Sequence, residues 1–487
     1  MQELAASFQD IAGAITSLVT SIAFSQVRVL GVDIEWAVVW LAVPMLFFTI
    51  YLGFVNIRCF PMSIRILKGH YADPDAPGEV SQFQALSTAL AGTVGLGNIA
   101  GVAIAIGIGG PGAAFWMVVI AFFAMSLKFA EVMLAVKHRT TLADGSVFGG
   151  PMYYLQAGLK EKNWPLLGKI LGLSYAVCAI PQILVFTQVN QAYSQFSAVT
   201  NIDAPWTFGL VLALAVALVI VGGIRSIASL TSRVVPLMCV IYLLAAVTIL
   251  ALHADAIPSA LVSIVSGAFA PEGVVGGVIG VFVIGMRRAV YSTEAGTGVS
   301  TMVHAAAKTR EPVSQGLAAT IEPFFDTMVV SSMTALVIVV TGAYQLEGVS
   351  DIQMTSAAFG SVIWWFPYIL AICVLLFAFT TIISWSYYMS RVWAFLAGYS
   401  RLSMYSYRIL FCVAVIPGAV LDIQQVIDFI DSLVVLITIP NIIGLYILAP
   451  TIKRDLQDYR ARMAAVKTAP NQMQNATGHG ETSQLNN

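Results

Sequence analysis

Long apolar runs, separated by short polar segments, make up most of this chain. A helix that spans a bilayer needs roughly 20 apolar residues, and the pattern predicts eleven spanning segments. Their approximate bounds are 35–56, 83–109, 112–136, 166–199, 206–222, 227–252, 273–306, 313–342, 358–396, 406–421 and 424–450. Residues 7–24 are amphipathic, which predicts an interfacial helix. The run 257–269 is too short to span and predicts a surface or re-entrant helix, and the polar residues from about 465 predict a disordered tail.

The composition supports an all-α polytopic membrane protein. The chain has 487 residues, of which 58% are hydrophobic and only 10% charged, whereas a soluble domain carries about 25% charged residues. No nucleophile–base set, HExxH motif or Cys/His cluster marks the end of any predicted span, so we expect no enzyme. Nothing suggests contact with nucleic acid or an obligate protein partner.

Lysine and arginine collect on alternate loops, which predicts the orientation of the chain. One set of loops carries them in the regions 58–68, 137–162, 225, 308–310, 401 and 453–462. The alternate loops, near 110, 201–205, 253–272, 343–357 and 422, contain none, and Arg28 is the exception on that side. The N-terminus is therefore predicted outside and the C-terminus in the cytoplasm.

Two of the predicted helices are interrupted by glycine and polar residues. The first interruption lies in TALAGTVGLGNIAG (88–101) and the second in GMRRAVYSTEAGTGVS (285–300), and both contain Ala-Gly-Thr. A broken helix leaves backbone groups that are tolerated at membrane depth only where they face protein or a water-filled cavity. Small residues could instead serve close helix packing, and the G-x-G-x-x-x-G spacing at 95–101 does not fit a dinucleotide fingerprint. A potassium-filter loop is disfavoured because the segment is long enough to cross completely.

The spacing of the two interruptions favours a secondary transporter. Five predicted helices separate them, so two groups of five helices run through the membrane in opposite senses. Broken helices at matching positions in inverted halves point to a binding site. The predicted divisions are an outer or interfacial segment (1–34), an extra helix with a cytoplasmic loop (35–82), the first repeat (83–252), an outer connector (253–272), the inverted second repeat (273–450) and a largely disordered cytoplasmic tail (451–487).

The sequence resembles the alanine or glycine:cation symporter family, the sodium:alanine symporter type, from about residue 35 to 455. The matching stretches are FQALSTALAGTVGLGNIAGVAIAIGIGGPGAAFWM (83–117), VFGGPMYYL (147–155), YSTEAGTG (291–298), PVSQGL (312–317), FFDTMVVSSMTALVI (324–338) and FAFTTIISWSYY (377–388). The resemblance implies a five-plus-five inverted-repeat fold of the leucine-transporter type with one extra N-terminal helix. It also implies uptake of a small neutral amino acid, driven by sodium or protons through alternating access, across a bacterial-type plasma membrane. Sodium would be the coupling ion, and no cofactor is expected.

The resemblance places the amino acid between the two broken helices. Amide groups at a half-helix start favour a carboxylate, and the Asn98 side chain either braces the gap or caps the following half-helix. Gln191 is a candidate for substrate contact or for helix-to-helix bonding, and Phe282 and Tyr291 for pocket lining or plain packing. Trp385 is expected as a pocket wall or lid. The predicted substrate-binding residues are Thr93, Gly95, Leu96, Gly97, Asn98, Gln191, Phe282, Tyr291 and Trp385.

A sodium site is expected where the helix 358–396 meets the first break. Its predicted residues are Ala91, Gly92, Val94, Thr380, Thr381 and Ser384. Hydroxyls and freed carbonyls would form an oxygen cage suited to a hard cation. The alternative is that the hydroxyls bond carbonyls of their own helix.

Buried ionisable residues are further candidates. Lys128 and Glu131 lie three residues apart and predict a structural pair on one helix face. Glu294, Glu322 and Asp326 could relay protons or pair with Arg287 and Arg288, and His304 is expected toward the cytoplasm. Departures from the family pattern occur at Leu96, Gln188, Tyr193, Ala289 and Thr293. They leave open which small zwitterion is carried, alanine, glycine or another, and whether sodium or protons drive its uptake. A passive channel is the alternative from a different functional class.

Overall fold

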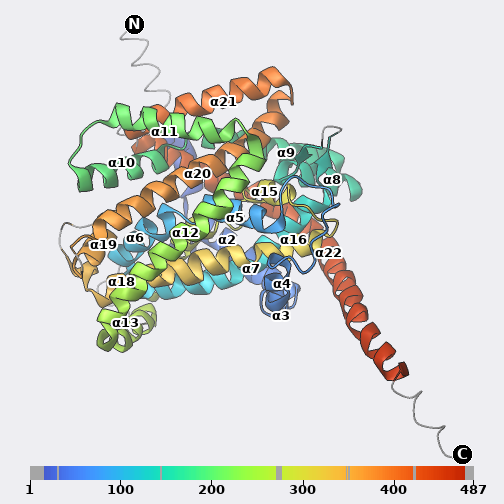
Figure 1. Cartoon of the computed structure of the whole chain (residues 1–487), viewed down its shortest axis with the longest axis horizontal. Helices are drawn as coiled ribbons and strands as arrows, with labels where there is room; N and C mark the ends of the chain where they lie inside the picture. Colours follow the sequence, from blue (N-terminus) through green and yellow to red (C-terminus); the bar gives the residue numbers. More distant parts are fainter. Residues whose placement is uncertain are drawn as a thin grey trace, which may run out of the picture.

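The computed structural model describes residues 16–29, 32–142, 145–269, 277–346, 348, 351–362, 364–420 and 424–477. Within them the chain is almost entirely helical, as Figure 1 shows. Two short antiparallel hairpins are the exceptions. The first pairs β1 (Gln26–Val29) with β2 (Val32–Glu35), and the second pairs β3 (Thr140–Thr141) with β4 (Val147–Phe148). The predicted interfacial helix is described from residue 16 onward, where residues 16–23 are helical.

The helices of the N-terminal half follow the predicted apolar segments closely. They are α2 (Trp36–Tyr51), α3 (Val55–Arg58), α4 (Phe60–Leu67), α5 (Gln82–Thr93), the 3-10 turn η1 (Leu96–Asn98), α6 (Ala100–Gly109), α7 (Gly112–Lys137), α8 (Pro151–Glu161), α9 (Pro165–Ala179), η2 (Ile180–Ile183), α10 (Phe186–Thr200), α11 (Pro205–Ile220) and α12 (Gly223–Leu252). A capping box fixes the start of α5, because the Ser81 hydroxyl accepts from the Gln84 amide while the Gln84 side chain accepts from the Ser81 amide.

The C-terminal half has the same character. Its elements are η3 (Ala254–Ala256), α13 (Ile257–Phe269), α14 (Gly277–Thr293), α15 (Thr301–Ala305), α16 (Pro312–Ala319), α17 (Ile321–Pro323), the π-helix η4 (Phe324–Ser331), α18 (Ser332–Val340), η5 (Ala343–Gln345), α19 (Asp351–Gly360), α20 (Phe366–Ala397), α21 (Arg401–Val415), η6 (Ile416–Ala419) and α22 (Gln424–Thr477). The short run 257–269 forms the separate helix α13.

Each of the eleven predicted segments contains a helix, and the all-helical membrane fold is confirmed. Within the described residues, seven continuous runs are long and apolar enough to cross a membrane: Gly112–Lys137, Pro165–Thr200, Gly223–Leu252, Pro312–Val340, Phe366–Ala397, Arg401–Ala419 and Ser432–Ala465. The remaining four segments contain α2, the pair α5–α6, α11 and α14, which are shorter or interrupted.

Two long helices position the broken ones. Helix α7 is the most buried of the seven, and it packs against α14, α16 and α2. Helix α20 packs against α5, α10 and α12. Because α7 carries α14 and α20 carries α5, each broken helix rests on a continuous one.

The C-terminal segment continues the last helix, α22. A largely disordered tail is expected from residue 451, but α22 continues as a helix to Thr477 and projects from the helical body (Figure 1). Leu456 and Tyr459 are buried on one face of it, and Arg462 pairs with Glu311 at 2.6 Å. The buried face and the ion pair stabilise this helix as far as Arg462. Residues 478–487 lie outside the described part of the chain.

Candidate functional site

The first break separates α5 from α6. Helix α5 ends at Thr93, Val94 is extended (φ −71°, ψ 99°), and the 3-10 turn Leu96–Asn98 precedes the start of α6 at Ala100. The α-helix is therefore interrupted between Thr93 and Ala100, at the position that the glycines predict. Val94 and Asn98 are fully buried, so the break faces protein.

The second break separates α14 from α15. Glu294 has a left-handed backbone (φ +49°), and Gly296 follows at φ +93°. A side chain is strained in the conformation of Gly296, and a Cβ there would also lie 2.7 Å from Leu41. The backbone conformation therefore favours glycine at this position, and a larger residue would also displace the Leu41 methyl group.

The two breaks lie beside each other. A Cβ on Gly97 would come within 3.8 Å of the Ser292 Cα atom, and the Ser292 hydroxyl donates to Asn98 Oδ1 at 3.3 Å. The predicted adjacency of the two interruptions is thus present in the structure.

Asn98 links the first break to two other helices. Its side-chain amide nitrogen donates to the main-chain oxygen of Asp326 (2.8 Å). Its main-chain carbonyl accepts a hydrogen bond from the Thr334 hydroxyl (3.0 Å). The π-helix η4 widens the helical turn at Asp326, and such bulges are frequent at functional sites. Helix α6 has no side-chain cap. The Asn98 side chain therefore spans from the first break to η4, as a bracing role requires.

Oxygen atoms gather where these elements meet. The Asp326 carboxylate accepts from Ser292 (3.2 Å) and from the Thr327 hydroxyl, and Ser292 and Thr327 are 2.6 Å apart. Among the described residues, Asp326 Oδ2 is buried without a hydrogen-bond partner. Within the same residues no three His, Cys, Asp or Glu side chains gather as a transition-metal site requires.

Thr381 contacts the first break from α20, and Ser384 lies one turn further along the same helix. The Thr381 hydroxyl donates to the carbonyl of Ala91 at 2.9 Å, and a Cβ on Gly95 would lie 3.1 Å from that hydroxyl. Ser384 is fully buried, and its Oγ has no hydrogen-bond partner among the described residues. One turn beyond Ser384, the Tyr388 hydroxyl donates to the Thr88 carbonyl at 3.3 Å. A Cβ on Gly92 would lie 2.7 Å from the Tyr388 hydroxyl oxygen.

Thr380 does not join this group. Its hydroxyl donates to carbonyls of its own helix, at Leu376 (2.9 Å) and Phe377 (3.1 Å), and it lies 3.9 Å from the Met238 sulfur on α12. The alternative of own-helix bonding therefore applies to Thr380, whereas Thr381 bonds across to α5.

The predicted substrate-contact residues are dispersed. Gln191 on α10 and Trp385 on α20 are half-buried, and Gln191 Oε1 and Trp385 Nε1 have no hydrogen-bond partner among the described residues. Phe282 packs edge-on against Trp116 at 5.1 Å, which fits the packing alternative. Thr93 bonds its own helix at Ala89 O (3.3 Å). The side chain of Leu96 lies outside the described part of the structure.

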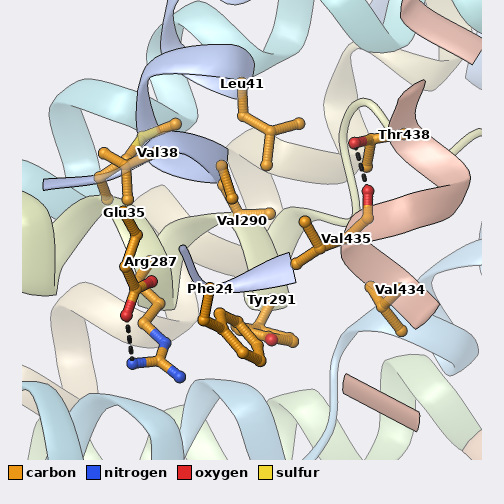
Figure 2. A pocket seen from close by; sticks show the side chains of 12 residues that line it. Phe24, Glu35, Val38, Leu41, Arg287, Val290, Tyr291, Val434, Val435 and Thr438 are labelled. Atoms are coloured by element: carbon orange, nitrogen blue, oxygen red, sulfur yellow. Dashed lines mark hydrogen bonds and ion pairs between the residues drawn. The ribbon is translucent and has the colours of Figure 1, made fainter. Parts of the chain in front are cut away.

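Tyr291 lines a cavity with about 370 Å³ of empty space between α2, α14 and α22. Figure 2 shows its ring beside Phe24, with Val435 across the cavity.

At the edge of this cavity, Arg287 pairs with Glu35 at 3.1 Å and lies over the Phe24 ring at 4.9 Å. Arg287 thus contacts the N-terminal hairpin, and the expected pairing with the acidic residues of the second break is wrong for this arginine.

A fully buried ionic cluster was missed as a unit. Lys128 Nζ lies 3.1 Å from Glu322 Oε1 and 3.1 Å from the Ser300 hydroxyl. Glu322 Oε2 is 3.2 Å from His304 Nε2, whose other ring nitrogen lies 2.7 Å from Gln315. The predicted pairing of Lys128 with Glu131 is therefore replaced by pairing with Glu322. His304 is fully buried in this cluster.

Glu131 instead holds the second break. Its Oε1 accepts from the Gly296 amide (3.0 Å) and from Asn441 (2.7 Å), while Asn441 also donates to the Gly296 carbonyl (2.8 Å). Tyr154 donates to Asn441, and Tyr175 donates to Thr297 O at 2.9 Å. Side chains thus satisfy backbone groups that the break frees. The signal in the sequence was the polar residue Asn441 inside an apolar span.

Comparison with known proteins agrees with this architecture. A profile of the sodium:alanine symporter family matches residues 18–474. The sodium/alanine symporter AgcS of Methanococcus maripaludis is 39% identical over 411 residues, which cover 83% of this chain and 89% of AgcS. The probable sodium/glutamine symporter GlnT of Bacillus subtilis is 32% identical over 426 residues, which cover 87% of each chain.

A solved structure shares the fold. The crystal structure of MhsT in complex with L-phenylalanine superposes with a TM-score of 0.54 at 15% identity, covering 78% of this chain and 98% of that one. The likeness shows a fold of the leucine-transporter type, as the sequence predicts.

Proposed function

Because the chain belongs to the sodium:alanine symporter family, we propose that it couples sodium entry to the uptake of a small neutral amino acid such as alanine or glycine. Transport would proceed by alternating access between two inverted five-helix repeats, 83–252 and 273–450. The observation that carries the proposal is the hydrogen bond from Thr381 to the Ala91 carbonyl beside the first break. The second broken helix reaches the same break through the bond of Ser292 to Asn98.

Sodium would bind between α5 and α20. The ligands would be the Ala91 and Val94 carbonyls and the Thr381 and Ser384 hydroxyls, with Gly92 and Gly95 leaving room for the close approach. Since the Thr381 hydrogen now points at Ala91 O, it would rotate away so that both oxygens turn lone pairs to the ion. Thr380, which bonds its own helix, would support this site only through packing.

The amino acid would bind beside the first break. Amide groups of residues 95–97 would hold its carboxylate, as half-helix starts do in transporters of this kind. Gln191 and Trp385 each carry a buried polar atom without a partner among the described residues, which supports a role near the ligand. Thr93, Leu96, Gly97 and Asn98 would form the backbone side of the pocket. Phe282 and Tyr291, both on α14, would pack the second broken helix against its neighbours.

Coupling follows if both ligands favour the same closed arrangement. Sodium would tie α5 to α20, and the substrate carboxylate would order the break that supplies the sodium carbonyls. Each ligand would then raise the affinity for the other by an equal factor, because linkage is reciprocal.

The substrate is tested by uptake into proteoliposomes that contain the full chain. Labelled alanine, glycine, their available D-isomers and glutamine are compared with and without an inward sodium gradient. We expect sodium-dependent uptake of alanine or glycine. Preference for another zwitterion would keep the symport and replace the substrate. Uptake that is unchanged when both the sodium and the proton gradients are collapsed would indicate a passive channel instead.

A further inference from the structure

A second cavity lies away from the two breaks, where α12, α20 and α21 meet. Its space, open solvent at the mouth included, is about 350 Å³, and Gly223, Ser386, Arg391, Tyr407 and Arg408 are among the residues that line it. Gly223 begins α12, Arg391 lies near the end of α20 and Arg408 is in the second turn of α21. The cavity is therefore at the end of the bundle that the basic loops predict to face the cytoplasm.

Arg391 is placed in this cavity without an acidic partner. Its side chain is only 8% exposed in the folded chain, and its guanidinium lies over the rings of Phe148 and Tyr387, 4.5 Å from each centroid. Its Nε and Nη1 atoms are buried and make no hydrogen bond to any residue that the structure describes. Buried guanidinium groups are ordinarily paired, since an unpaired buried charge is costly.

Two further features of the cavity favour an anion. Arg408 is half-buried beside the Tyr405 ring, and no carboxylate of the described residues forms an ion pair with it or with Arg391. The long helix α12 begins at the cavity with no side-chain cap, so its positive end is directed there. The Glu79 carboxylate, on the loop near Phe148, accepts a hydrogen bond from the Val147 amide at 2.9 Å and makes no ion pair with either arginine.

We propose that this cavity binds a phosphate group through Arg391, Arg408 and the start of α12. The planar fork of arginine matches phosphate oxygens, and two arginines supply more than one charge. The phosphate would belong either to the headgroup of an anionic phospholipid or to a soluble phosphate. Arg391 lies ten residues beyond Thr381 on α20, about 15 Å along the helix, so an occupied site would restrain the helix that carries the candidate sodium ligands.

The test uses the purified full chain in a neutral detergent. Thermal unfolding is followed while dioctanoyl phosphatidylglycerol, dioctanoyl phosphatidylcholine or inorganic phosphate is titrated. We expect phosphatidylglycerol to raise the midpoint with a saturable dependence. Phosphatidylcholine has the same chains and no net charge, and we expect a much smaller shift. An equal response to inorganic phosphate would assign the site to soluble phosphate, and a response to phosphatidylglycerol alone would assign it to lipid.

Variants locate the site. We expect Arg391→Gln and Arg408→Gln each to weaken the apparent affinity about tenfold, the loss of one charge-assisted contact. Arg401→Gln removes the same charge from the exposed start of α21, outside the cavity, and is expected to titrate like the wild type. If Arg391→Gln fails to fold, Arg408→Gln carries the comparison. The proposal is overturned if no phosphate compound shifts the midpoint, if phosphatidylcholine matches phosphatidylglycerol, or if Arg408→Gln responds like Arg401→Gln. The titration requires no transport, so it stands apart from the proposed symport.

Discussion

The two broken helices are held open in different ways. At the second break, Glu131 and Asn441 bind both the amide and the carbonyl of Gly296, and the ionic cluster around Lys128 lies beside it. At the first break the contacts are neutral, through Asn98 and Thr381. No described side chain accepts a hydrogen bond from the amides of residues 95–97. A break whose backbone is already satisfied is suited to a scaffold, and one with open amides is suited to a ligand. The first break is therefore the better candidate for the ligand-binding side.

The largest expected effect belongs to the scaffold beside the second break. Glu322→Ala leaves Lys128 buried without its partner, which typically costs about 3–5 kcal/mol. We expect a large fall in the thermal midpoint. The double variant Lys128→Met/Glu322→Gln removes both charges and keeps an amide for His304, so it should recover most of the loss. Equal stability of the single and double variants would contradict a charge-pair role for Glu322.

Thr381→Val tests the first break with little expected change in stability. The lost hydroxyl is one of the proposed sodium ligands, so the apparent sodium affinity of uptake should fall at least tenfold, while the fold loses about 1 kcal/mol for one hydrogen bond. Thr380→Val is the matched control on the next residue, because its hydroxyl bonds its own helix. The same sodium dependence in both variants would remove Thr381 from the cation site.

Glycine variants sharpen the same comparison within one segment. An added Cβ at Gly95 would press on the Thr381 hydroxyl at 3.1 Å, whereas at Gly101 nothing lies within 4 Å of it. We expect Gly95→Ala to impair sodium-dependent uptake severalfold. Gly101→Ala should leave uptake intact and stabilise α6 by up to about 1 kcal/mol, the helix preference of alanine. Unimpaired uptake by Gly95→Ala would show that close approach at this position is unnecessary.

The smallest effect is expected from an exposed ion pair outside both breaks. The hydrogen bond from Arg310 holds the pKa of Asp73 below its ordinary value of 3.8. The pair therefore stabilises the fold above that ordinary pKa, and the contribution is lost as the pH falls through the lowered value. Arg310→Gln should be slightly less stable than the wild type near neutral pH, and the difference should vanish in strong acid. A difference that grows with acidification, in midpoints measured across this range, would contradict the assignment.

The sequence predicted the helical segments and both breaks because glycine and polar residues stand out inside apolar runs. Asn98, Thr381 and Gly95 could be singled out on that ground. The clamp on Gly296 could not, since Glu131 and Asn441 are 310 residues apart along the chain and nothing in one sequence pairs them. For the same reason Lys128 was matched with its neighbour Glu131 and not with the distant Glu322. The contact of the last helix with the body, such as the ion pair of Arg462 with Glu311, likewise joins residues far apart along the chain.

Sodium-driven accumulation is the most direct test of the central claim. Proteoliposomes with the full chain are loaded with labelled alanine at a fixed inside-to-outside ratio, and net flux is measured while the sodium gradient is varied. We predict net uptake against the alanine gradient when the sodium gradient is large enough, with a reversal point that shifts as the sodium gradient changes. Net flux that always follows the alanine gradient, at every sodium gradient, would contradict coupled transport.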